Sequence, residues 1–103
     1  MARPIRILLA DDVAMFRDLG KVFLSRSGTV DLAASASQAF EIARERPPAV
    51  VIADMHLPDL DGPSLCRAFK SDPAWGFPRV VLLARATSPA DHAAAVRAGA
   101  DEV

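Results

Sequence analysis

Short apolar segments alternate with segments of helical periodicity along the whole chain, and this alternation is the strongest constraint on its fold. Continuous apolar or β-branched runs predict strands at residues 5–10, 29–34, 49–53 and 80–83. Apolar residues at three- and four-residue spacing, together with capping signals, predict helices over 13–27, 37–46, from Pro63 onward, and over 88–98. Strands that alternate with helices over one short domain predict an α/β fold built on a doubly wound parallel sheet.

Local signals mark where several of these elements begin and end. Ser37 is predicted to be the N-cap of the second helix, and Ser88 that of the fourth, which has a proline at its first position. Residues 100–103 are interpreted as the entry to a fifth strand that the sequence does not complete. In the connector over 72–78, Trp75 and Phe77 form either a hydrophobic lid over the sheet or a patch for a partner.

Composition excludes several classes of protein. The chain has 103 residues, 51% of them hydrophobic, which suits one globular domain with a core rather than a disordered chain. A net charge of -1 argues against nucleic-acid binding by this domain, and no apolar run approaches the ~20 residues that cross a membrane. The single Cys66 excludes an intrachain disulfide, and the expected location is the cytoplasm.

Acidic residues stand where two of the predicted strands end. Asp11 and Asp12 follow the first strand, and Asp54 follows the third. If these strands are neighbours, three carboxylates meet at one edge of the sheet, where functional crevices of such folds lie. Such a cluster would suit Mg²⁺, and a carboxylate can act as the nucleophile that forms an aspartyl phosphate. The alternative is that these acids only solvate the edge or cap the next helix.

Three motifs in order carry a family resemblance. They are ILLADD at residues 7–12, DMHLPDLDG at 54–62 and AGADE at 98–102. In them the chain resembles, over essentially its whole length, the receiver domain of two-component response regulators. The resemblance implies a flavodoxin-like strand order 2-1-3-4-5. It also identifies residues 1–103 as a receiver domain that is short at its C-terminus, with the fifth strand and last helix incomplete or missing.

The same resemblance assigns roles to the acidic residues. Asp54 would be the phosphoacceptor and Asp12 a direct ligand of Mg²⁺, while Asp11 would act mainly through water. His56 would offer its backbone carbonyl to the metal. Ligation by the His56 imidazole is the less favoured interpretation.

Two departures from the family pattern stand out. The family carries Ser or Thr at the end of the fourth strand, where this sequence has either Leu83 or Ala84, depending on whether one counts from Pro78 or from Gly99. The family also has Lys-Pro after the fifth strand and then a final helix, and the sequence ends at Val103 before both. Truncation is the favoured explanation, and a missing helix of ~10–14 residues would expose one flank of the sheet.

The leading hypothesis is a signalling domain, not an enzyme in its own right, that accepts a phosphoryl group on Asp54 with the help of Mg²⁺. Its implied partners are a sensor histidine kinase or phosphotransfer protein and a downstream protein or effector domain. A homodimer is a further candidate assembly. The main alternative is a pseudo-receiver, an interaction module with weak or uncoupled phosphorylation. A small Mg²⁺-dependent phosphotransfer enzyme is less favoured, because the short loops leave little room for substrate.

Overall fold

Strands and helices alternate strictly along the chain. The computed structural model describes residues 5–84 and 88–103. In chain order the elements are β1 (Ile5–Ala10), α1 (Ala14–Leu24), β2 (Gly28–Ala33), α2 (Ala36–Glu45), β3 (Val50–Asp54), α3 (Gly62–Ser71), the short 3₁₀ helix η1 (Pro73–Trp75), β4 (Arg79–Leu83) and α4 (Pro89–Arg97). The predicted α/β fold is confirmed.

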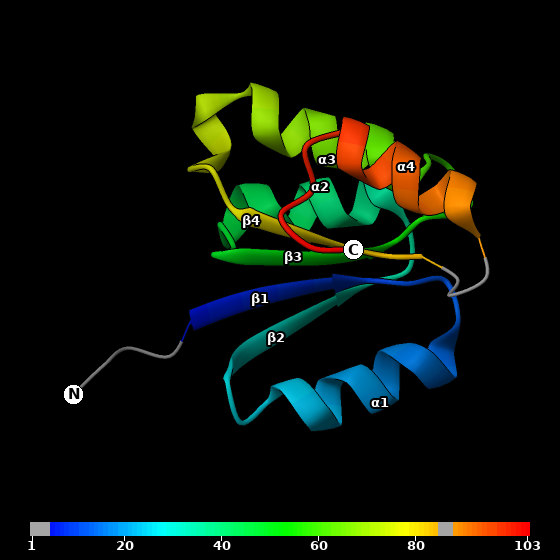
Figure 1. Ribbon diagram of the computed structural model, residues 1–103. Coiled ribbons are helices and arrows are strands. Elements are labelled where there is room, and N and C mark those ends of the chain that lie inside the picture. The colour runs from blue at the N-terminus through cyan, green and yellow to red at the C-terminus, as the bar shows by residue number, and fades with distance from the viewer. Residues whose placement is uncertain (1–4, 85–87) are drawn as a thin grey trace.

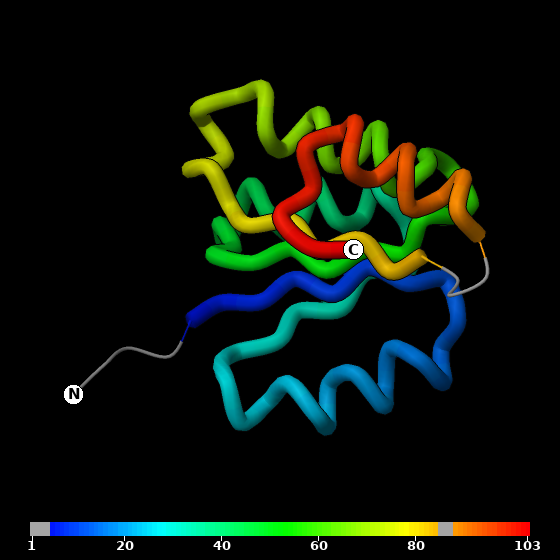
Figure 2. The backbone as a smooth tube through the Cα atoms, in the orientation of Figure 1, coloured from blue at the N-terminus to red at the C-terminus, as the bar shows by residue number. Residues whose placement is uncertain are grey.

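The four strands form one parallel sheet in the order β2-β1-β3-β4. This order agrees with the first four positions of the sheet that the family resemblance implies. After α4 the chain returns beside β4 (Figure 2), where Val81 and Glu102 form a parallel bridge and the Leu82 amide donates to the Glu102 carbonyl at 3.0 Å. The C-terminal residues therefore occupy the place of a fifth strand without completing one.

Helices cover the two faces of the sheet unequally. Helices α2, α3 and α4 lie on one face and α1 lies on the other (Figure 1). The buried core fills the space between the sheet and the three helices, with Leu8, Val51, Leu65, Phe69, Val80 and Leu82 among its fully buried side chains. Cys66 is buried in this core, as expected of a packing residue, and burial raises the pKa of its thiol.

The apolar stripe of α1 faces solvent. None of its residues is fully buried, and the exposed fractions of five large apolar side chains run from 48% at Leu19 to 76% at Phe23, with Met15, Phe16 and Val22 in between. Within residues 5–84 and 88–103, no helix is long and apolar enough to cross a membrane.

The N-terminus of α2 differs from its prediction. Ser35, rather than Ser37, is the N-cap, and its hydroxyl accepts a hydrogen bond from the Gln38 amide at 3.1 Å. Ser37 is already helical, and its amide and hydroxyl both donate to the Asp59 carboxylate at 2.9 Å. Asp59 also accepts from the Ala36 amide at 2.8 Å. A carboxylate from the loop after β3 thus satisfies first-turn amides that a helix leaves unpaired.

The connector before β4 separates its two aromatic residues. Trp75 packs against Phe40 and Phe69, with ring centroids 5.6 and 5.0 Å away, which favours the lid over the partner patch for this residue. Phe77 is instead 64% exposed and adopts a positive φ of 54°. Only Trp75 contributes to the core.

We predict that Asp59→Asn destabilises the fold at neutral pH and does so less in acid. Hydrogen bonds from the Ser37 and Ala36 amides lower the pKa of Asp59 below its usual value. A lowered folded-state pKa contributes stability above the unfolded-state pKa of about 3.9, and this stability is lost as the pH falls below it. Urea unfolding at about pH 7 and about pH 3 measures the free energy of unfolding of both proteins. The difference between wild type and variant should be smaller at the lower pH.

Glu41→Gln, which alters an exposed carboxylate on the same helix, is the control for general charge effects. A difference in the free energy of unfolding between wild type and Asp59→Asn that is equal at both pH values would contradict the capping role of Asp59.

Candidate functional site

Three carboxylates meet at one edge of the sheet. Asp11 directly follows β1, Asp12 is next, and Asp54 is the last residue of the neighbouring strand β3. One ligand oxygen from each lies within 4.8 Å of the others. The expectation that the first and third strands are neighbours and bring these acids together is confirmed.

Asp11 is the member of this cluster that the fold holds most tightly. Its side chain is buried, and one carboxylate oxygen accepts a hydrogen bond from the Val13 amide at 2.9 Å. Burial raises the pKa of Asp11, the Val13 hydrogen bond opposes that effect, and the charges of Asp54 and Asp12 add to the increase. The cluster is therefore a place where a bound cation would relieve an electrostatic cost.

Asp54 is positioned by a tightly folded loop. Its carboxylate accepts a hydrogen bond from the His56 amide at 2.9 Å, and the Gly62 amide closes the loop on the Met55 carbonyl at 2.8 Å. A Cβ atom at Gly62 would lie only 2.8 Å from the Asp54 carbonyl oxygen, so this close approach requires glycine. The loop motif thus holds the Asp54 side chain at the end of its strand.

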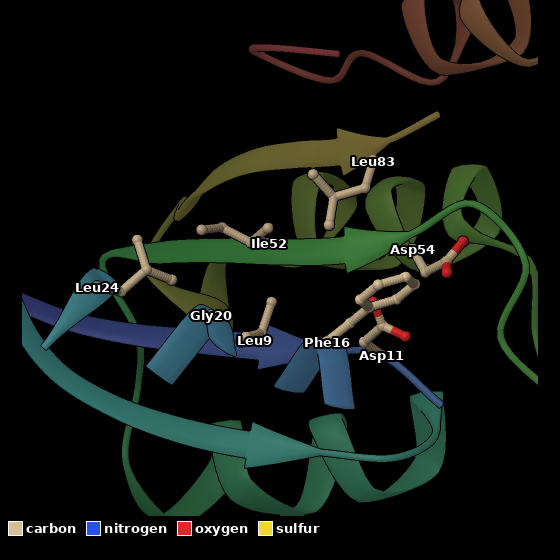
Figure 3. A pocket seen from close by; sticks show the side chains of 8 residues that line it. All are labelled: Leu9, Asp11, Phe16, Gly20, Leu24, Ile52, Asp54 and Leu83. Atoms are coloured by element: carbon tan, nitrogen blue, oxygen red, sulfur yellow. The ribbon is translucent and has the colours of Figure 1, made fainter. Parts of the chain in front are cut away.

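Two adjoining cavities open beside the carboxylates. The smaller, of about 310 Å³, is lined by Asp12, Val13, Phe16, Asp54, His56, Leu83 and Ala84. The larger, of about 450 Å³, extends between α1 and the sheet (Figure 3), with the Phe16 ring beside the Asp11 carboxylate and Ile52 farther along β3. Asp54 lines both cavities, so its carboxylate is open to a small group that enters from solvent.

Leu83 faces the candidate phosphoacceptor. It is the register partner of Asp54 on β4, it lines both cavities, and it is 44% exposed. Ala84 is half-buried, packs against the core and lines the smaller cavity. Leu83 therefore occupies the position where the family pattern has a hydroxyl, and neither residue has one. Arg85 and Thr87, which follow in the sequence and carry polar side chains, lie outside the described residues.

Two charged residues near the site have no signal in the sequence motifs. An Arg17 guanidinium nitrogen donates to the Asp11 carbonyl at 2.7 Å, which brings a positive charge from α1 to the acidic cluster. Asp91 of α4 lies 3.0 Å from the His56 imidazole nitrogen Nε2. The sequence motifs give no sign of this contact, because the two residues are 35 positions apart in the chain.

The donor set fits a hard divalent cation. Carboxylate oxygens are the ligands that Mg²⁺ prefers, and it usually takes one or two of them and keeps several waters. Asp12 is exposed and Asp54 half-buried, so water can reach the cluster. The His56 imidazole is directed to Asp91, which leaves its ligation of a metal unsupported.

Comparison with known proteins identifies relatives. The family model described as the response regulator receiver domain matches residues 7–103. The response regulator MprA of Mycolicibacterium vanbaalenii is 40% identical over 101 residues, which are 96% of this chain and 42% of that protein. The response regulator Rre1 of Synechocystis is 39% identical over 88 residues, 82% of this chain and 38% of that protein. The chain therefore spans about two fifths of the length of these relatives.

Solved structures show the same architecture. The signal receiver domain of an HD domain-containing protein from Pseudomonas fluorescens superposes with a TM-score of 0.87 at 26% identity, covering 99% of this chain and 75% of that one. The chemotaxis response regulator CheY4 of Vibrio cholerae, at 23% identity, shares the fold with a TM-score of 0.85, covering 95% of this chain and 82% of that one.

We predict that Mg²⁺ stabilises the wild-type chain more than the Asp12→Asn variant. A cation that binds only the folded state adds about 2.7 kcal/mol at a concentration one hundred times its dissociation constant. Removing one carboxylate weakens that binding, while it also relieves repulsion in the metal-free protein. Thermal unfolding with and without Mg²⁺ measures both effects, with Asp18→Asn on the outer part of α1 as a control.

Equal stabilisation of wild type and Asp12→Asn by Mg²⁺ would show that the three carboxylates do not form a shared site.

Proposed function

The chain belongs to the family of response regulator receiver domains, and from that premise we propose that it accepts a phosphoryl group on Asp54 from a sensor histidine kinase or phosphotransfer protein. The observation that supports this most is the placement of Asp54. It ends β3 beside Asp11 and Asp12, its carboxylate is held by the His56 amide, and it opens onto a cavity.

The transfer needs a nucleophile and compensation of charge. A carboxylate oxygen of Asp54 attacks the phosphorus of a phosphohistidine, an O–P bond forms and the P–N bond breaks. The leaving imidazole keeps the electron pair and takes up a proton from water. When bound, Mg²⁺ supplies positive charge that neutralises the phosphoryl oxygens. In this proposal Asp12 and Asp54 bind the metal directly, Asp11 acts mainly through water, and the His56 backbone carbonyl completes the protein ligands.

The proposal extends to the role of the domain as a whole. Residues 1–103 form a receiver domain that assists its own phosphorylation and later hydrolysis and is otherwise not an enzyme. It works in the cytoplasm and passes the signal to a downstream protein or effector domain. Binding of nucleic acid or a membrane is not part of its role.

One observation favours a second candidate. Leu83 faces Asp54 without a hydroxyl, so its side chain cannot donate a hydrogen bond to a phosphoryl group. A pseudo-receiver, in which phosphorylation is weakly coupled to the rest of the domain, would show this feature. The three intact carboxylates favour the phosphoacceptor instead.

We predict that acetyl phosphate with Mg²⁺ adds one labile phosphoryl group to the chain and that Asp54→Asn abolishes the addition. The amide of Asn cannot act as the carboxylate nucleophile. Intact-mass measurement, before and after treatment with hydroxylamine to cleave an acyl phosphate, gives the readout. Asp59→Asn, which alters a carboxylate engaged with α2, should retain the modification. Undiminished modification of Asp54→Asn would identify another acceptor.

We predict that Leu83→Thr enlarges the response of β4 and α4 to phosphorylation. A hydroxyl that bonds to a phosphoryl oxygen is a charge-assisted hydrogen bond of about 1.5–3 kcal/mol. This difference corresponds to about a tenfold to hundredfold change in the population of the switched state. Amide chemical shifts along both elements, with and without beryllium fluoride as the phosphoryl mimic, measure the response.

Ala84→Thr is the matched control for Leu83→Thr, because Ala84 packs against the core. A response of wild type that neither substitution improves would show that other groups couple the site to α4.

A further inference from the structure

One side-chain contact joins helix α4 to the candidate phosphorylation site. The Asp91 carboxylate oxygen Oδ2 lies 3.0 Å from the His56 imidazole nitrogen Nε2, across 35 residues of sequence. Asp91 is only 16% exposed at its side chain, whereas His56 is 58% exposed. The more buried partner is therefore the one that belongs to the helix.

The main chain of His56 contacts the site directly. Its backbone amide donates to the Asp54 carboxylate at 2.9 Å. The imidazole contacts Asp91, and the side chain also lines the smaller cavity with Asp54. A single residue thus links the carboxylate of the proposed phosphoacceptor to α4 through two consecutive hydrogen bonds.

The first turn of α4 fixes where Asp91 lies. The Asp91 amide donates to the Ser88 hydroxyl at 3.2 Å, so this residue belongs to the capped end of the helix. A shift of this turn moves the Asp91 carboxylate relative to His56. By contrast, Leu83 and Ala84 at the end of β4 present apolar side chains to the cavity, whereas the His56 side chain makes a polar contact with α4.

We propose that Asp91 is a positioning residue, which acts through His56 on Asp54 and transmits phosphorylation of Asp54 to α4. This inference rests on the proposed function. In a phosphorylated Asp54 the negative charge lies on the phosphoryl oxygens, so both oxygens of the former carboxylate are weaker acceptors for the His56 amide than they were in the free carboxylate. The loop then favours a different position of His56, and the bond to Asp91 couples that change to the helix.

The experiment compares the binding of a phosphoryl mimic with the response of the helix. Beryllium fluoride with Mg²⁺ is added to wild type, Asp91→Ala, His56→Ala and the double variant, and amide chemical shifts are recorded. We expect Asp91→Ala to bind the mimic as wild type does, as reported by the shifts at Asp54 and Met55, and the α4 shifts of all four proteins are compared at mimic concentrations that saturate these binding shifts. In both single variants most of the shift along α4 is lost, and the double variant loses no more than either single one, because the two residues act as a unit.

Two further variants sharpen the test. His92→Ala removes an exposed imidazole from the same helix and should keep the full response of α4. Asp91→Asn keeps an oxygen that can accept from the imidazole and should restore part of the response. His56→Ala leaves the sequence of α4 intact. If Asp91→Ala perturbs the helix, the α4 shift of His56→Ala therefore shows whether the contact between the two residues carries the response.

A full α4 shift in Asp91→Ala and His56→Ala, with binding intact, would overturn this inference and leave the proposed function standing. If wild type shows no shift at Asp54 or Met55, the proposed function fails, and this inference fails with it.

Discussion

Repulsion between carboxylates held at the end of neighbouring strands is the interaction on which the rest of this structure depends. The register that pairs Ala10 with Ala53 places Asp11 and Asp54 at the same edge of the sheet. Two unit charges about 4 Å apart repel by about 4 kcal/mol at an effective dielectric constant of about 20. That cost is a substantial fraction of the net stability of a small domain, about 5–15 kcal/mol. The buried core between the sheet and α2, α3 and α4 must therefore hold the edge together.

Much of this architecture could be predicted from the sequence, because apolar runs and helical periodicity mark the strands and helices locally. The apolar run over Ile5–Ala10 is the strand β1 without any change of boundary, because a strand buried along most of its length needs a continuous apolar run. The helix expected over 13–27 is shorter, Ala14–Leu24, because the chain turns after Leu24, with the Ser27 amide donating to the Leu24 carbonyl, and enters β2 at Gly28. The three site aspartates followed from the rule that parallel strands end at one edge.

Contacts between distant segments could not be predicted in the same way. Ser35 and Ser37 are equally good caps by residue type, and the choice between them depends on Asp59, 22 residues beyond Ser37. The pairing of His56 with Asp91 depends on how α4 packs over the end of the sheet. Counting along the sequence left Leu83 and Ala84 as alternatives for one position, and the register of β4 against Asp54 separates them. In each case the deciding information is the relative placement of elements.

The capping of α2 by Asp59 has a consequence for how the domain moves. Asp59 lies in the loop that begins at the candidate phosphoacceptor, yet its carboxylate accepts the first-turn amides of another helix, at Ala36 and Ser37. If this loop swings outward, those amides lose their acceptor, so the first turn of α2 keeps only the Ser35 cap and frays more readily. Hydrogen exchange at the start of α2 therefore reports the mobility of a loop that is far from it in sequence. A substitution or movement in the loop after β3 therefore also affects α2, the helix that precedes β3.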